Sequence, residues 1–229
     1  MREEWIFADK HLSKISVSSN PNNEPVSVHG TSDHLRCIGI GTDAAVFQSI
    51  DVPDYAFKMY ANDRVQKVQI ETEVYEKLGD SPYFSTCFGY KDNYLVLSFE
   101  EGINLYDCLL QGIPIPNEVI EDVDQAREYV RQKGLNPRDI HLKNILLQNG
   151  RAKIIDVSEY VKPGNDMRWE HLKKAYDLYY PFIKGKPVPH LIIETIRKTY
   201  NHRSIHSAPF DEFMDQTYSF LSKFWKKED

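Results

Sequence analysis

The residues best suited to chemistry lie between positions 139 and 156 of this 229-residue chain. Asp139 is followed five residues later by Asn144, and an apolar stretch then leads to a second acid, Asp156. A carboxylate can orient a hydroxyl group and take its proton, and carboxylate and amide oxygens are the hard ligands that Mg²⁺ prefers. The three residues in this order therefore predict a loop and a following strand that hold a magnesium-bound nucleotide for phosphoryl transfer.

The run at residues 137–147 resembles the catalytic loop of the protein-kinase-like superfamily, in which His-Arg-Asp-Leu is followed by an Asn. Pro137 stands where that family has the His. His141 creates the pattern Asp-x-His-x-x-Asn, which looks like the loop of the aminoglycoside and choline phosphotransferases of the same superfamily. The resemblance implies that Asp139 orients the acceptor hydroxyl and that Asn144 binds a metal ion.

The segment after the loop resembles a shortened activation segment. Asp156, Val157 and Ser158 occupy the place of Asp-Phe-Gly, which makes Asp156 the metal ligand that accompanies Asn144. Asp166 follows Asp156 by only ten positions, and the Ala-Pro-Glu that ends this segment in typical protein kinases is absent. This spacing resembles the small atypical kinases of the RIO type and implies a minimal activation segment.

Two motifs earlier in the chain resemble the phosphate-binding parts of the same superfamily. Gly39, Gly41 and Val46 fit the Gly-rich loop, with Ala44 at the place of its third glycine, and such loops bring backbone N–H groups close to phosphate oxygens. Glycine pairs also mark ordinary hairpins, so the order of the motifs carries this interpretation. Lys58 lies in an apolar strand that resembles Val-Ala-Ile-Lys, which implies a lysine on the α- and β-phosphates.

That lysine needs a carboxylate partner from the following helix. Glu71 fits the family spacing, because apolar residues follow it one and two turns later, while Glu73 and Glu76 stay open as alternatives. Residues 95–102 resemble the strand and hinge that present backbone groups to an adenine, and Glu100 lies in this segment.

The periodicity of apolar residues predicts strands in the first half of the chain and helices in the second. Strands are expected at residues 15–18 and 26–29, which form a hairpin, and at 35–40, 44–50, 55–60, 84–90 and 94–99, with one helix at 63–78. Helices are expected at residues 104–111, 117–133, 166–184, 190–200 and 210–227. This order, together with the motifs, predicts an α+β, two-lobed protein-kinase-like fold. Its β-rich N-lobe spans residues 1–102, with an N-terminal extension at 1–34, and its helical C-lobe spans 103–229.

Composition narrows the class of protein. Hydrophobic residues make up 41% and charged residues 27%, which is ordinary for a globular protein, and the net charge of −6 argues against nucleic acid as a partner. Three scattered cysteines form no Cys-x-x-Cys pair, so we expect a reducing cytoplasm. We expect neither a membrane span nor a signal peptide.

Two weaker patterns leave alternatives open. Asp166 and Trp169 resemble the Asp and Trp of the helix that supports the catalytic loop, although an amphipathic helix start explains them equally well. His202 and His206 have metal-ligand spacing but no third ligand at a sensible distance in sequence, which favours unpaired surface histidines. His141 is expected to serve its own loop.

Together the motifs predict an ATP- and Mg²⁺-dependent phosphotransferase, with a protein Ser/Thr kinase as the first hypothesis. Lys58, Asp139 and Asn144 are the expected catalytic residues. A phosphotransferase that acts on a small-molecule hydroxyl group is an alternative, because of the Asp-x-His-x-x-Asn pattern. A nucleotide-binding pseudokinase that serves as an interaction module is another, because of the replaced motif residues Ala44, Pro137, Val157 and Ser158.

Overall fold

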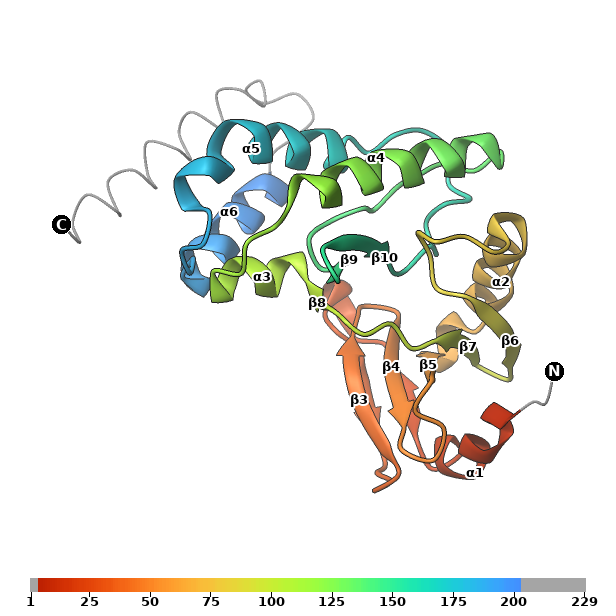
Figure 1. The fold of residues 1–229 in the computed structure, drawn as a ribbon. Coiled ribbons are helices and arrows are strands. Elements are labelled where there is room, and N and C mark those ends of the chain that lie inside the picture. The colour runs from red at the N-terminus through yellow and green to blue at the C-terminus, as the bar shows by residue number, and fades with distance from the viewer. Residues whose placement is uncertain (1–3, 203–229) are drawn as a thin grey trace. The chain divides into compact units, whose positions relative to one another are not determined.

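The computed structural model describes residues 4–202 (Figure 1). The chain forms two compact units, and each unit is built from several separate segments. Unit 1 contains residues 1–101, 123–138 and 153–165, and unit 2 contains residues 102–122, 139–152 and 166–229. One boundary falls inside helix α4 (Asn117–Gln132) and another inside strand β10 (Arg151–Ile154).

Unit 1 is organised around a five-stranded antiparallel sheet with the strand order β3-β4-β5-β7-β6. Its strands are β3 (Leu35–Ile40), β4 (Ala44–Ser49), β5 (Tyr55–Tyr60), β6 (Cys87–Lys91) and β7 (Tyr94–Ser98). Central strand β5 and its neighbour β7 are almost entirely buried, as their apolar sequences require. Helix α2 (Gln66–Leu78) follows a 3₁₀ turn (Asn62–Arg64) and packs beside β6 and β7.

The N-terminal segment adds a second layer to unit 1. It consists of a 3₁₀ turn (Glu4–Ala8), the short helix α1 (Asp9–Leu12) and the antiparallel pair β1 (Ser16–Ser18) and β2 (Ser27–His29), with a 3₁₀ turn at Pro21–Asn23 between them. Leu12 and Val17 belong to the same buried cluster as Phe57 of the sheet. The Asp9 carboxylate accepts hydrogen bonds from the Lys91 ammonium at 2.5 Å and the Tyr94 hydroxyl at 2.9 Å, which fasten α1 to the sheet.

Unit 2 is mainly helical. Helix α3 (Leu105–Gln111) is capped at its N-terminus by Asn104, whose side-chain oxygen accepts the Asp107 N–H at 2.9 Å. Gly112 caps its C-terminus with a φ of 69°, which suits glycine. Helices α5 (Arg168–Ile183) and α6 (His190–His202) complete the described helices. A small sheet with the order β10-β9-β8 contains β8 (Ile103–Asn104) and β9 (Ile145–Gln148).

The α+β prediction is confirmed, and most predicted elements lie within a few residues of their expected positions. The strand at residues 84–90, whose apolar sequence predicts burial, forms only in part, and the expected burial was wrong. Strand β6 begins at Cys87 and is half-exposed, because it lies at the sheet edge and pairs with β7 alone. Phe84 instead forms an isolated parallel bridge with Ile154. The strand expected between the loop and Asp156 corresponds to β10. The helical turns at residues 4–12 and strands β8 and β9 were not predicted, and the helix expected at 210–227 lies outside the described residues.

Two further observations concern predictions from composition. Cys37, Cys87 and Cys108 are all free thiols. Within residues 4–202, no helix has both the length and the apolar character needed to cross a bilayer.

Candidate active site

Lys58 lies on the central strand of unit 1, paired in register with Val46 on one side and Leu95 on the other. Only 9% of its side chain is exposed, so its ammonium group requires partners inside the protein. The Lys58 Nζ atom donates to Oε1 of Glu71 at 2.9 Å and lies 2.8 Å from Oε2. The structure thus joins the predicted lysine to Glu71 of helix α2, whereas Glu73 and Glu76 are exposed.

The Glu71 carboxylate is fully buried and has further donors. The Tyr60 hydroxyl donates to Oε2, and the Val157 backbone N–H donates to Oε1 at 3.4 Å. Burial raises the pKa of Glu71, and the Lys58 charge opposes that rise. Strand β5, helix α2 and the segment after Asp156 therefore meet at one carboxylate within unit 1.

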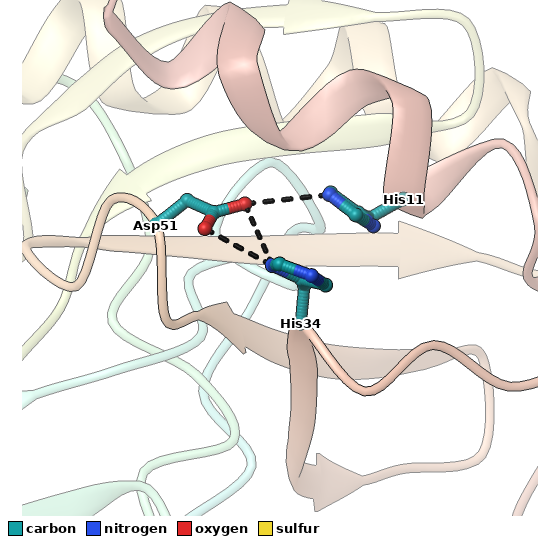
Figure 2. A group of neighbouring side chains, drawn as sticks. All are labelled: His11, His34 and Asp51. Atoms are coloured by element: carbon teal, nitrogen blue, oxygen red, sulfur yellow. Dashed lines mark hydrogen bonds and ion pairs between the residues drawn. The ribbon is translucent and has the colours of Figure 1, made fainter.

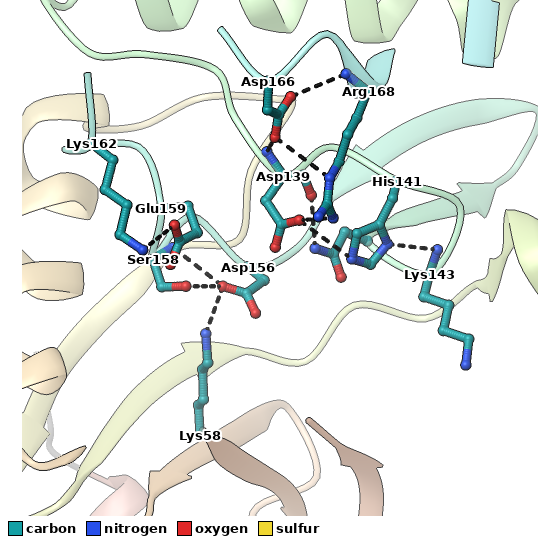
Figure 3. Close-up of polar contacts among 11 residues, drawn as sticks. Lys58, Asp139, His141, Lys143, Asp156, Ser158, Glu159, Lys162, Asp166 and Arg168 are labelled. Carbon is teal, nitrogen blue, oxygen red and sulfur yellow. Dashed lines mark hydrogen bonds and ion pairs between the residues drawn. The ribbon is translucent and has the colours of Figure 1, made fainter. Parts of the chain in front are cut away.

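Asp156 is the second acid bound to Lys58 (Figure 3). Its Oδ1 atom accepts the Lys58 ammonium at 2.8 Å, the Ser158 hydroxyl at 2.8 Å and the Ser158 N–H at 3.2 Å. Among the described residues, no hydrogen bond reaches Oδ2, and 38% of the side chain is exposed. Burial opposes ionisation, but Lys58 and Ser158 outweigh it and lower the pKa of Asp156 to about 2. Asp156 is therefore an anion at neutral pH, and within residues 4–202 its Oδ2 atom accepts no hydrogen bond.

The charge on Lys58 is secured by the same contacts. Burial alone would lower the pKa of its ammonium group, but the attraction of Asp156 and Glu71 holds that pKa well above its ordinary value. Lys58 therefore stays positively charged at neutral pH, and its ammonium group is hydrogen-bonded to Oδ1 of Asp156.

Unit 2 holds the predicted residues of the catalytic-like loop, arranged around Asp139. The Asp139 N–H donates to Oδ2 of Asp166 at 2.7 Å, and the Asp139 carboxylate forms an ion pair with the Arg168 guanidinium. The Asn144 amide nitrogen donates to the Asp139 carbonyl at 3.1 Å, which closes the loop on itself. The weak resemblance at Asp166 thus corresponds to a real contact with the loop, and the neighbouring Trp169 is buried.

Both aspartates have a left-handed backbone, with φ of 55° at Asp139 and 67° at Asp156. Asp tolerates this conformation better than most residues, yet it is uncommon outside glycine and tends to occur at functional sites. The contacts just described hold both residues in this conformation.

Other loop residues have supporting roles. Arg138 donates from Nη1 to the carbonyl oxygens of Pro163 at 2.6 Å and Gly164 at 3.1 Å, so it stabilises the end of the segment that follows Asp156. The Nδ1 atom of His141 accepts the Lys143 N–H at 3.3 Å, and its Nε2 atom lies 3.9 Å from Oδ1 of Asp139. Both contacts are within the loop, so His141 stabilises its conformation.

The structure adds Arg168, Ser158 and Tyr60 to the residues that the sequence indicated. Arg168 had one available signal, since it lies two residues after Asp166, but a short-range charge pair of this kind is common on helix starts. Ser158 stands where the family has glycine, and only its hydrogen bonds to Asp156 reveal its contribution.

The predicted Gly-rich loop joins β3 to β4 in unit 1. The Gly41 N–H donates to the Ala44 carbonyl at 2.8 Å, and Gly39 pairs with Val46 across the hairpin. A Cβ atom at Gly39 would lie 3.8 Å from Val46, and one at Gly41 would lie 3.4 Å from the Ala44 oxygen, both ordinary contacts. Neither glycine has a positive φ. The fold itself therefore requires glycine at neither position.

The side chain of Glu100 is engaged inside unit 1. It accepts the Ser98 hydroxyl at 2.5 Å and lies 3.6 Å from the Lys153 ammonium. Only its backbone remains suited to the adenine contact expected for a hinge residue.

Comparison with known proteins decides the family. No protein-family model matches the chain. A protein of Bacillus subtilis (strain 168), named "Putative serine/threonine-protein kinase YrzF", is 32% identical over 188 residues, which cover 81% of this chain and 87% of that protein. The chain belongs to the protein-kinase-like superfamily. The α+β fold is thus the kinase-like fold, and the motifs at Lys58, Asp139 and Asp156 stand in a kinase-like chain.

A partial similarity to a solved structure was also found. The crystal structure of the Rad53 kinase domain and SCD2 matches with a TM-score of 0.44 and 21% identity, over 55% of this chain and 50% of the other. The family assignment rests on the Bacillus subtilis relative alone.

Proposed function

We propose that this kinase-like protein transfers a phosphoryl group from Mg²⁺-bound ATP to a Ser or Thr hydroxyl group of a protein. The observation that carries this proposal is the one-sided bonding of Asp156. Three donors converge on Oδ1, whereas Oδ2 receives none among the described residues, in a carboxylate whose pKa is lowered to about 2. An ionised, oriented and partly exposed oxygen of this kind is suited to a hard divalent cation.

The other residues have roles that follow from their contacts. Lys58, held by Glu71, supplies a fixed positive charge for the α- and β-phosphates. Asn144 uses its amide nitrogen within the loop, so its amide oxygen is the atom for a second metal contact. When bound, Mg²⁺ would neutralise negative charge on the phosphates. Asp139 orients the acceptor hydroxyl and takes its proton, with Asp166 and Arg168 holding its position.

The glycine loop supports a nucleotide on structural grounds. Gly39 and Gly41 have room for a methyl group and ordinary backbone angles, so their identity has no cause inside the fold. A ligand that approaches the backbone closely would supply such a cause. We therefore expect alanine at both positions to leave the melting temperature nearly unchanged and to weaken ATP binding about tenfold, or about 1.4 kcal/mol.

The short segment after Asp156 bears on regulation. Its two hydroxyl-bearing residues are Ser158, which is bonded to Asp156, and Tyr160, which is fully buried. Arg138 fastens the end of the segment. Phosphorylation of this segment would break contacts that it already makes, so we propose that activity does not depend on it.

The acceptor is proposed from the family. The relative from Bacillus subtilis carries the name "Putative serine/threonine-protein kinase YrzF", and the Arg-Asp of the loop resembles protein kinases. The pattern that contains His141 favours a small alcohol instead.

One experiment tests both the nucleotide and the acceptor. The melting temperature of the purified chain is measured with ATP, with and without Mg²⁺, and should rise only when both are present at millimolar concentration. Asp156→Ala should lose this Mg²⁺-dependent rise.

Labelled ATP is then supplied with separate protein and metabolite fractions of a lysate. Label on Ser or Thr that Asp139→Asn abolishes would support a protein kinase, and label confined to metabolites would refute that acceptor. Nucleotide binding without any transfer would favour the pseudokinase.

A further inference from the structure

Three side chains of unit 1, far apart in sequence and separate from the residues assigned to the nucleotide, gather into one cluster (Figure 2). They are His11 on helix α1, His34 just before β3 and Asp51 just after β4. One ligand atom from each, two imidazole nitrogens and a carboxylate oxygen, lies within 4.8 Å of the other two. We propose that these residues form a binding site for Zn²⁺.

The spacing of the ligand atoms supports this proposal. The Nδ1 atom of His34 lies 3.0 Å and 3.1 Å from the two carboxylate oxygens of Asp51, and Nε2 of His11 lies 3.3 Å from Oδ2 of Asp51. Zinc bonds of about 2.0–2.1 Å in a tetrahedron place neighbouring ligand atoms about 3.3–3.4 Å apart. The distances from each histidine nitrogen to Asp51 therefore already match those around a zinc ion, and the third separation lies within 4.8 Å. Two imidazoles and one carboxylate form a usual zinc ligand set and leave a fourth position for water.

His11 provides the second, independent observation. It is only 6% exposed, yet among the described residues its buried Nε2 atom makes no hydrogen bond, and Oδ2 of Asp51 lies 3.3 Å away. An imidazole nitrogen buried without a hydrogen-bond partner is costly unless something else satisfies it. Its other nitrogen, Nδ1, lies 3.0 Å from the Ser32 hydroxyl. A hydrogen bond from Nδ1–H to that oxygen would fix the tautomer in which the lone pair of Nε2 faces Asp51, as the outer partners of metal-bound histidines do.

The backbone holds the cluster in place before any ion arrives. His34 and Asp51 lie at the open end of the β3–β4 hairpin, where the Ile50 N–H donates to the His34 carbonyl at 3.0 Å. The Ser49 hydroxyl accepts the Asp51 N–H at 3.2 Å. The rings of His11 and His34 stack with their centroids 4.1 Å apart.

The kind of ligand atom distinguishes this site from the proposed Mg²⁺ site. Mg²⁺ prefers oxygen ligands, whereas imidazole nitrogens favour zinc and its neighbours in the first transition series. Zn²⁺ bound here would join helix α1 to the first hairpin of the sheet. We therefore expect zinc to stabilise the N-terminal segment independently of any nucleotide.

The test uses the full chain in a Cys37→Ser background, which removes an exposed thiol that could bind zinc elsewhere. Metal is stripped with a chelator, and Zn²⁺ is titrated against a chromophoric competitor with Mg²⁺ in excess. We expect one equivalent to bind, and we expect His34→Ala and Asp51→Asn to weaken it at least a hundredfold. Both side chains are partly exposed, which limits the risk to folding.

Two further variants and a second readout make the result specific. Ser32→Ala should weaken Zn²⁺ binding roughly 10- to 100-fold, as loss of an outer partner does. His29→Ala is the matched control, because His29 is an exposed histidine that bonds to Ser18, and it should leave zinc affinity unchanged. Co²⁺ in place of Zn²⁺ should give the visible absorption of a tetrahedral site, lost in His34→Ala. A lack of zinc binding by the parent protein, or equal affinity in His34→Ala and His29→Ala, would overturn the proposal.

Discussion

Removal of Lys58 should expose how strongly it is coupled to Glu71. Lys58→Met keeps the length of the side chain and leaves the Glu71 carboxylate, which has no exposed surface, without its cation. Loss of one partner from a buried ion pair typically costs about 3–5 kcal/mol. We expect about 3 kcal/mol at pH 7, since Glu71 keeps the Tyr60 hydroxyl as a donor and can take up a proton.

The double variant Lys58→Met/Glu71→Gln separates coupling from simple loss of contacts. Its amide is neutral and can still accept from Tyr60, so we expect it to be about 2 kcal/mol more stable than the sum of the two single changes predicts. The partly buried pair of Lys67 and Asp43, 2.6 Å apart in the same unit, is the matched control, since solvent reaches both of its side chains. There the coupling energy should be at most about 1 kcal/mol, because solvent screens the charges.

Urea titrations followed by circular dichroism give the free energies of unfolding. Acid should relieve the penalty of Lys58→Met. The pKa of Glu71 is raised by burial, so the unfavourable charge is present above that pKa and is lost as the pH falls through it. Coupling below about 0.5 kcal/mol between Lys58 and Glu71, or a penalty that grows from pH 7 to pH 5, would refute this account of the pair.

Two other changes test particular features of unit 1. Because the pKa of Asp156 is lowered to about 2 in the folded protein, its ionised form contributes stability above its unfolded pKa near 4, and this is lost as the pH falls to 2. Two pKa units correspond to about 2.7 kcal/mol, which we reduce to roughly 1 kcal/mol because the side chain is 38% exposed. Asp156→Asn should therefore destabilise by that amount at pH 7 and by much less at pH 2, where about half of the folded molecules carry a protonated Asp156. An unchanged difference across this range would contradict the assignment. Gly134→Ala should cost about 1–2 kcal/mol because its φ is positive, and Gly30→Ala should cost more because a Cβ there would also lie 2.0 Å from the Lys14 oxygen. Equal losses of stability in chemical denaturation would show that the clash is relieved.

The sequence predicted those parts of the protein that depend on local patterns. Lys58 could be placed on a buried strand because apolar residues surround it, and Glu71 was preferred by helical spacing with Tyr75 and Leu78. The family motifs also located Asp139, Asn144 and Asp156. Each of these depends on neighbours within a few residues, which a single sequence displays.

The parts that were missed depend on contacts between distant segments. Strand β8 has two residues, too few for a pattern. Arg168 shows its link to Asp139 only when helix α5 and the loop are placed together. His11, His34 and Asp51 belong to three different elements, and strand register brings the last two together. Spacing in the sequence also drew attention to His202 and His206, whose side chains lie outside the part of the chain that the structure describes.

Phosphoryl transfer by the purified chain tests the central claim most directly. Wild type, Asp139→Asn and the control Asp92→Asn, an exposed turn residue with φ of 48° that asparagine tolerates, are incubated with γ-labelled ATP, Mg²⁺ and a protein acceptor fraction. The account predicts Mg²⁺-dependent labelling by wild type and Asp92→Asn, and a rate at least about a hundredfold lower for Asp139→Asn with ATP binding retained. Labelling that survives in Asp139→Asn, or its absence with wild type while ATP binds, would contradict the claim.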